Sequence, residues 1–203
     1  MELELKKECL DTYELGEPQT LTQEETAETI VPDYCPDIAR IISAEGVVCL
    51  HGGTEQDGVT GTVRVTVLYT PENESGVRAL EFAMPFSAQG EGLAGCAHVV
   101  VETEIELLES RMLNPRKIFT RCKLVTHLAG CRKVCLTISS DAETDPALLV
   151  EKRCCGQTVS LLRQVAEKDL TFSETMSLSL GREGAAELLH CRANGIVTET
   201  KAI

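Results

Sequence analysis

Cysteine and histidine side chains that could bind a metal ion gather between residues 122 and 135. The run Cys122-x4-His127-x3-Cys131-x3-Cys135 could offer zinc four soft ligands. It contains no C-x2-C pair, however, and in a strand Cys131 and Cys135 would lie on one face, two ladder steps apart. A single ion could reach both thiols only if the strand bent. We therefore favour packing of these side chains over zinc binding, which remains an alternative.

A glycine-rich run could in principle cradle a phosphate. Residues 90–95 read Gly90-Glu91-Gly92-Leu93-Ala94-Gly95 and match the G-x-G-x-x-G pattern of nucleotide sites. That mechanism needs a helix N-terminus directly afterwards, whereas residues 96–101 have a strand-like composition. Glu91 would also place a negative charge inside the anion site. The run therefore predicts a loop between strands.

Residues suited to catalysis do not form a known arrangement. The chain contains no G-x-S-x-G, H-E-x-x-H or P-loop motif. Its histidines occur in unrelated contexts, with no acidic partner at an informative spacing (His51, His98, His127 and His190). Glu102 and Glu104 fit the solvated face of a strand better than a pair of catalytic carboxylates. We expect no catalytic residue and no cofactor, and so no enzyme.

Composition and charge narrow the possible partners further. The net charge of −13 argues against binding to nucleic acid or to an anionic membrane surface. No segment approaches the ~20 apolar residues of a membrane-spanning helix, and the N-terminus has no signal-peptide core. We therefore expect a cytoplasmic protein, with its ten cysteines reduced. Aromatic residues make up only 3% of the chain, so the core must be largely aliphatic.

The elements that would position these residues are mostly strands. Apolar or small residues alternate with polar ones over 59–69 and over 80–86, as in half-buried strands. Turn-forming residues at 71–76 join the two into a hairpin. Pro85 cannot donate to a ladder and places its strand at an edge or a bulge.

The rest of the chain adds further strands and one helix. Strand-like runs cover 99–107, 118–125 and 134–138. Pro36 near its start and Gly46 beyond its end predict a short helix at 36–44, echoed at 184–191. Together the elements predict a mainly β fold, an antiparallel sandwich or barrel-like unit with one short helix.

The chain also begins to repeat itself. Leu-Thr-Gln-Glu-Glu-Thr at 21–26 returns as Leu-Thr-Phe-Ser-Glu-Thr at 170–175. Turn formers at 139–146 mark a boundary, so we predict one unit over 1–150 and the opening of a second over 151–203. An incomplete second unit would leave a strand edge unpaired, from which we expect a homo-oligomer.

Two short motifs resemble a known family. They are Val31-Pro32-Asp33-Tyr34-Cys35-Pro36-Asp37-Ile38 and Asn114-Pro115-Arg116-Lys117, and the strands between them agree. In these features the chain is similar to the SPOCS domain of spore-coat morphogenetic proteins of the SipL and SpoVID type. Relatives carry tandem copies of this unit, often followed by a LysM module. The chain has no LysM module and stops inside the second copy, and from this stop we expect a truncated form of a longer protein.

The resemblance implies a non-catalytic role. Such proteins help attach the assembling coat to the forespore surface in the mother cell, through a coat morphogenetic ATPase. The candidate partner contacts are Tyr34, Asp37, Arg40, Arg116 and Lys117. The structural alternative is that Pro36-Asp37 caps a helix and Asn114-Pro115 forms a turn. A carbohydrate- or ligand-binding β module is the second function considered, although sugar sites favour the aromatic residues that this chain lacks.

Overall fold

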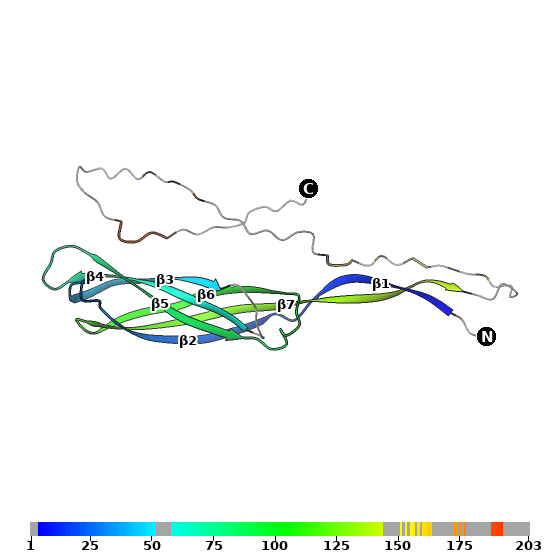
Figure 1. Cartoon of the computed structure of the whole chain (residues 1–203), viewed down its shortest axis with the longest axis horizontal. Helices are drawn as coiled ribbons and strands as arrows, with labels where there is room; N and C mark the ends of the chain where they lie inside the picture. Colours follow the sequence, from blue (N-terminus) through cyan, green and yellow to red (C-terminus); the bar gives the residue numbers. More distant parts are fainter. Residues whose placement is uncertain are drawn as a thin grey trace.

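The residues that the structure describes form seven antiparallel strands (Figure 1). The computed structural model describes residues 4–51, 58–143, 151, 153, 155–156, 158, 160–163, 173, 175, 177 and 188–192. The strands are β1 Glu4–Leu15, β2 Gln19–Ile30, β3 Ile38–His51, β4 Gly58–Pro71, β5 Arg78–Gln89, β6 His98–Asn114 and β7 Lys117–Glu143. The mainly β, antiparallel class predicted from the sequence is confirmed.

The strands form two sheets. In one sheet β7 is central, with β6 along one side and β1 followed by β2 along the other. The second sheet has the order β3-β4-β5. Its β4–β5 hairpin is the one predicted over 59–69 and 80–86, and Pro85 lies on β5, an edge strand, as expected.

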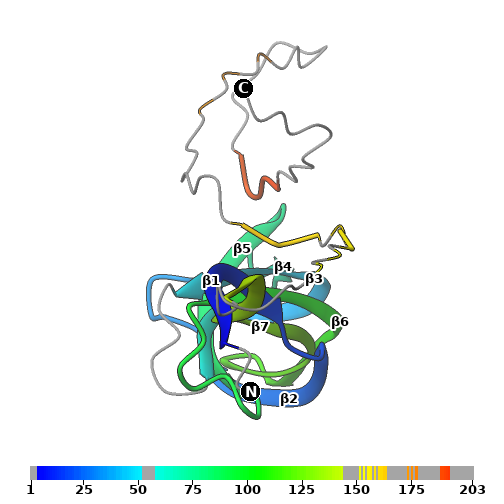
Figure 2. The same cartoon turned by 90° about the vertical axis from the view of Figure 1, so that its right-hand side faces the viewer.

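The two sheets pack face to face as a sandwich that is nearly closed on both sides. β3 lies beside β6 and β2 beside β5, in neither case joined by a ladder. Figure 2, which looks along the sandwich, shows the strands arranged around the core. At the β3–β6 seam a Cβ on Gly46 would lie 2.8 Å from Cδ1 of Ile105, so a larger residue here would require that side chain to shift.

Alternating side chains from both sheets fill the core. Val63, Val65 and Val67 of β4 point inward and pack in one cluster with Cys122 and Leu124 of β7. The strands with regular apolar alternation supply most of this core. It is largely aliphatic, as the composition predicts.

β7 is longer than the sandwich. It pairs with β6 only as far as Cys131, and from there to Glu143 its one partner among the described strands is β1. The result is a two-stranded ribbon, β1 with residues 131–143 of β7, that projects from the sandwich in Figure 1. The strands predicted separately at 118–125 and 134–138 are therefore two parts of one strand.

The helix predicted at 36–44 is wrong, because this segment opens β3. Register shifts between Ile38 and Arg40, and between Ile41 and Ser43, mark two β-bulges. As a result Ile38, Ile41 and Ala44 all pack on the core at a spacing of three residues. The two bulges thus give this strand an apolar spacing that is typical of a helix. Of the echo at 184–191, residues 184–187 lie outside the described residues and 188–191 are not helical.

The predicted division into two units stays a prediction. β7 runs through the first half of the boundary expected at 139–146. Residues 144–150 and most of 151–203 lie outside the described residues. The loop predicted at 90–95 does connect β5 to β6.

Candidate interaction site

Arg116 lies in the tight turn between β6 and β7. Asn114 pairs with Lys117, so Pro115 and Arg116 are the two turn residues. The backbone N–H of Arg116 donates to Oδ1 of Asn114 at 2.9 Å, an Asx contact that fixes the turn. The turn predicted at Asn114-Pro115 is therefore confirmed.

The guanidinium of Arg116 holds the loop between β2 and β3. Nη1 donates to the carbonyl oxygen of Cys35 at 2.8 Å and to Oδ1 of Asp37 at 3.0 Å. Nη2 donates to the carbonyl oxygen of Val31 at 2.9 Å and to Oδ1 of Asp33 at 3.1 Å. We call these five residues the Arg116 clamp.

Backbone contacts strengthen the clamp. The N–H of Val31 donates to the carbonyl of Arg116, and that of Ile38 donates to the carbonyl of Pro115, both at 2.9 Å. A planar guanidinium presents several donors in a fixed fork and so can satisfy two carbonyls and two carboxylates together. The two motifs that carry the family resemblance therefore meet at one point of the fold.

The clamp fixes the loop that presents Tyr34. This side chain is 88% exposed, although its neighbours Asp33 and Cys35 both contact Arg116. A large aromatic side chain is thus displayed from a restrained backbone. The restraint lowers the conformational entropy that a partner would have to remove on binding.

The other predicted contact residues each have different interaction partners. Asp37 does not cap a helix, because strand β3 begins directly after it, and its carboxylate pairs with Arg116. Lys117 forms an ion pair with Glu28 of β2. Arg40 is exposed on β3, and its carbonyl accepts a hydrogen bond from Oγ1 of Thr70 at 3.3 Å.

Among the clamp residues that contribute a side chain, Asp33 is the one that the sequence analysis did not select. The signal was present, because the 31–38 motif holds two acidic residues and the 114–117 motif holds an arginine. The sequence alone does not show that the two motifs meet, because about 80 residues separate Asp33 from Arg116.

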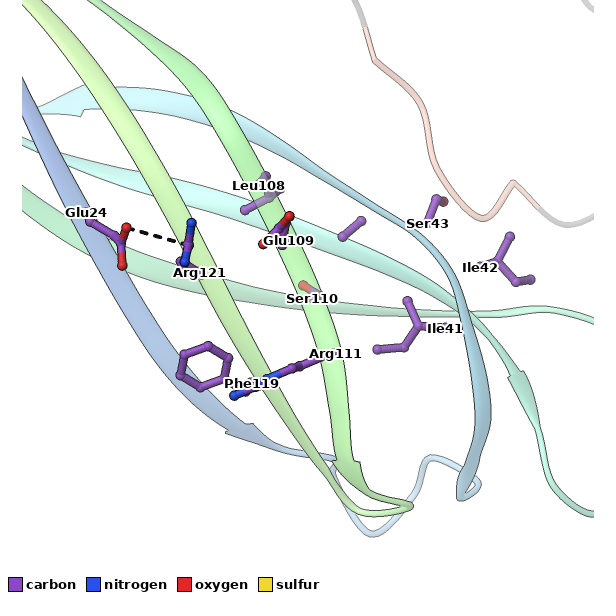
Figure 3. A pocket seen from close by; sticks show the side chains of 11 residues that line it. Glu24, Ile41, Ile42, Ser43, Leu108, Glu109, Ser110, Arg111, Phe119 and Arg121 are labelled. Carbon is purple, nitrogen blue, oxygen red and sulfur yellow. Dashed lines mark ion pairs between the residues drawn. The ribbon is translucent and has the colours of Figure 1, made fainter.

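A groove of about 740 Å³ opens between β3 and β6 and extends over β7 to β2 (Figure 3). The guanidinium of Arg111 lies 4.8 Å from the ring centre of Phe119, the one aromatic side chain in the lining, and covers one face of that ring. Arg121 Nε lies 3.6 Å from Oε2 of Glu24. The groove therefore offers a sugar a single aromatic ring, one face of which Arg111 occupies.

The four residues of the possible zinc motif are not brought together. Cys122 is buried in the core. His127 is exposed on the other face of β7, and Cys131 and Cys135 lie further along that face. Burial, with a smaller contribution from Glu25, raises the pKa of the Cys122 thiol to about 11, which opposes the thiolate that zinc requires. Within the described ranges no group of three or more His, Cys, Asp or Glu side chains could hold a metal ion.

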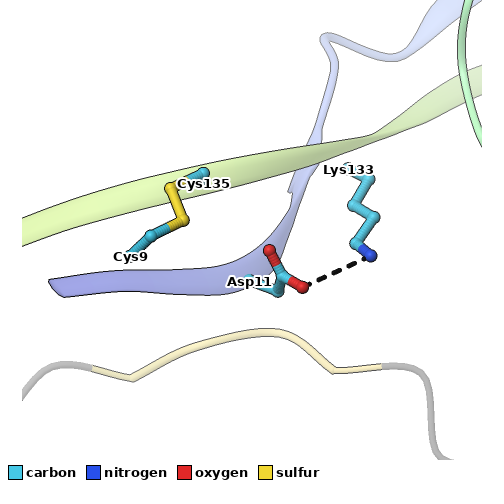
Figure 4. The surroundings of a disulfide bond; sticks show 4 residues. All are labelled: Cys9, Asp11, Lys133 and Cys135. Carbon is cyan, nitrogen blue, oxygen red and sulfur yellow. Dashed lines mark ion pairs between the residues drawn. A yellow bond between two sulfur atoms is a disulfide. The ribbon is translucent and has the colours of Figure 1, made fainter.

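The expectation that all ten cysteines are reduced is wrong for one pair. Cys9 of β1 and Cys135 of β7 form a disulfide across the ribbon, with their Cα atoms 5.6 Å apart (Figure 4). Asp11, which is paired in register with Cys135, also lies 3.4 Å from Nζ of Lys133. The pairing joins residues 126 positions apart, which the sequence does not indicate.

The histidines occupy separate parts of the fold. His51 and His127 contact the hydroxyls of Thr62 and Thr20, at 2.7 and 3.0 Å. His190 does have an acidic neighbour, because its Nε2 lies 3.1 Å from Oε2 of Glu45. The sequence spacing concealed this pair, which joins a segment near the C-terminus to β3.

Comparisons with models of protein families, with curated proteins and with solved structures found no match to this chain. Among the described residues there is no helix with the length and hydropathy needed to cross a membrane.

Proposed function

We propose that this chain is a non-catalytic structural and interaction module that helps attach or assemble the spore coat on the forespore surface, in the cytoplasm of the mother cell. One observation carries the proposal. The segments that resemble the SPOCS domain, 31–38 and 114–117, meet in the Arg116 clamp, and the clamp holds Tyr34 outward.

An exposed tyrosine on a restrained loop suits protein recognition. Tyrosine is enriched among the residues that dominate binding energy, because it offers a large apolar surface and a polar tip at low entropic cost. Near it, the side chain of Asp33 is fully exposed and that of Asp37 is about half exposed. The fitting partner has an apolar pocket beside basic residues, and the family resemblance suggests a coat morphogenetic ATPase.

The test follows a fluorescent fusion of the full gene product in sporulating cells. We expect a ring around the forespore, and Tyr34→Ala should disperse it. Val100→Ala is the matched control, since Val100 is 62% exposed on β6, outside the clamp. A diffuse signal from the unaltered protein would overturn the proposal, and a ring that survives Tyr34→Ala would exclude this loop as the contact.

The groove of Figure 3 supports a second candidate, a carbohydrate- or ligand-binding module. Its lining mixes acidic and basic side chains, which could hold a polar ligand. A glycan-binding screen with the purified chain distinguishes the two functions. The spore-coat proposal predicts no retained glycan, and binding that Arg121→Gln removes would favour the second candidate.

A further inference from the structure

One edge of the ribbon has no partner strand among the described residues. β6 stops pairing with β7 at Cys131, and the described residues supply no other strand along that side from 132 to 143. On the opposite side the same stretch pairs with β1. An isolated two-stranded ribbon is only marginally stable in water, so an added strand would stabilise it.

The backbone polar groups on this open edge can be assigned. The carbonyl of Gly130 accepts from the N–H of Gly16, on the β1–β2 side, at 2.7 Å. The carbonyl of Cys131 accepts from the N–H of Ala97, on the β6 side, at 2.8 Å. Because these directions alternate along a strand, Lys133, Cys135 and Thr137 present their N–H and C=O groups to the open edge.

The charged side chains along this edge complement those of a second, antiparallel copy of the same strand. Arg132 and Lys133 make one end basic, and Asp141 and Glu143 make the other end acidic. The residues between them include the apolar side chains Val134, Leu136 and Ile138.

An antiparallel neighbour with the same sequence would place basic ends against acidic ends twice, whereas a parallel neighbour would oppose like charges. Ser140 is the extra residue of a bulge opposite Lys6 and Lys7. The charge complementarity is therefore one between the ends of the two strands and not between single paired residues.

We propose that a second copy of this chain pairs antiparallel with β7 along residues 132–143, forming a continuous four-stranded β1-β7-β7-β1 sheet across a two-fold axis. Such an interface is isologous, because the same edge serves both copies. Main-chain hydrogen bonds supply affinity, as in strand addition to a sheet edge, and the charged ends fix the direction. The proposal uses only β1 and β7 and stands independently of the spore-coat function.

Two charge-reversed chains test the direction and the partner together. The variant R132E/K133E has an edge that is acidic at both ends, and D141K/E143K has one that is basic at both ends. We expect each alone to have the mass of one chain, 22.1 kDa, by light scattering after gel filtration. Mixed in equal amounts, they should form a dimer, while the unaltered chain dimerises alone.

Mixing the two variants distinguishes a loss of contacts between chains from a loss of contacts within one chain. The Arg132 contact with Gly92 and the ion pair of Lys133 with Asp11 are lost in R132E/K133E whether or not the partner is present. Recovery on mixing must therefore come from contacts between chains. A wild-type chain that stays monomeric at every concentration, or a mixture that fails to associate while the wild type dimerises, overturns the proposal.

A proline provides an independent check. Thr137→Pro removes an N–H from the open edge and leaves the hydrogen bonds to β1 in place. We expect it to lose the dimer, and Thr137→Val, which keeps the N–H, to retain it. Circular dichroism confirms that both variants keep their strands. A dimer that persists in Thr137→Pro would contradict pairing through this edge.

Discussion

At the scale of single residues, the clamp makes Arg116 the most consequential surface side chain. Its side chain is 34% exposed, and the guanidinium donates to four oxygen atoms of the 31–37 loop, two of them backbone carbonyls. Arg116→Ala leaves those carbonyls without their donors. We expect a loss of about 2 kcal/mol in the free energy of unfolding, measured by urea denaturation.

Lys117→Ala is the matched control for Arg116→Ala. Lys117 is the neighbouring residue and makes one partly exposed ion pair, so its removal should cost less than about 1 kcal/mol. Arg116→Lys should fall between the two, because an ammonium cannot reproduce the fork. Equal losses for Arg116→Ala and Lys117→Ala would show that the clamp adds nothing beyond an ordinary surface pair.

At the scale of elements, the ribbon depends on its disulfide more than the sandwich does. Among the described strands β1 pairs with β7 alone, and the Cys9–Cys135 bond ties the outer half of β1 to β7. We expect Cys9→Ser to speed amide hydrogen exchange over Glu4–Leu15 at least tenfold, while β4 stays protected within the core. Mass spectrometry of peptides from both regions measures the difference.

Reduction of the native chain should reproduce the Cys9→Ser pattern. Cys49→Ser serves as the control, because Cys49 is a free thiol on β3 and its removal should leave the ribbon unchanged. If β4 and β1 accelerate equally after reduction, the ribbon and the sandwich unfold as one unit and the distinction between them is wrong.

The strands that could be predicted from the sequence are those with regular alternation. β4 and β5 each bury every second residue, and their hairpin was predicted within a few positions. β2 alternates as well, but Gln23 and Glu25 occupy its inward positions, so it carries no apolar period. Its partners come from β7, about a hundred residues away.

The remaining differences arise from register. In β3, two bulges gave the inward residues a spacing of three and a false helical period. In the clamp and the ribbon, Arg116 meets Asp33 and Cys9 meets Cys135 through pairing between distant strands. Sequence analysis selected Arg116 and Asp37 as notable residues without showing that they bind each other.

At the scale of the whole molecule, the sandwich holds two ionisable side chains in a neutral form. Burial first, and then the proximity of Glu25, raises the pKa of Cys122 from 9.0 to about 11. Burial, followed by the influence of Cys35, raises the pKa of Tyr69, whose hydroxyl lies 3.3 Å from the carbonyl oxygen of Pro36. The two residues come from opposite sheets and belong to one core cluster.

These raised pKa values predict that the fold weakens in alkali. Because the folded chain holds the Cys122 proton more tightly than the unfolded chain, the stabilisation is complete below pH 9 and is lost as the pH rises towards 11. The free energy of unfolding should fall by about 1.4 kcal/mol per pH unit in this interval from one proton, with Tyr69 adding to the fall above pH 10. Urea denaturation at a series of pH values measures the slope. In Cys122→Ala the slope between pH 9 and 10 should be shallower even though the cavity lowers stability throughout, and an unchanged slope would mean that other groups cause the alkaline loss.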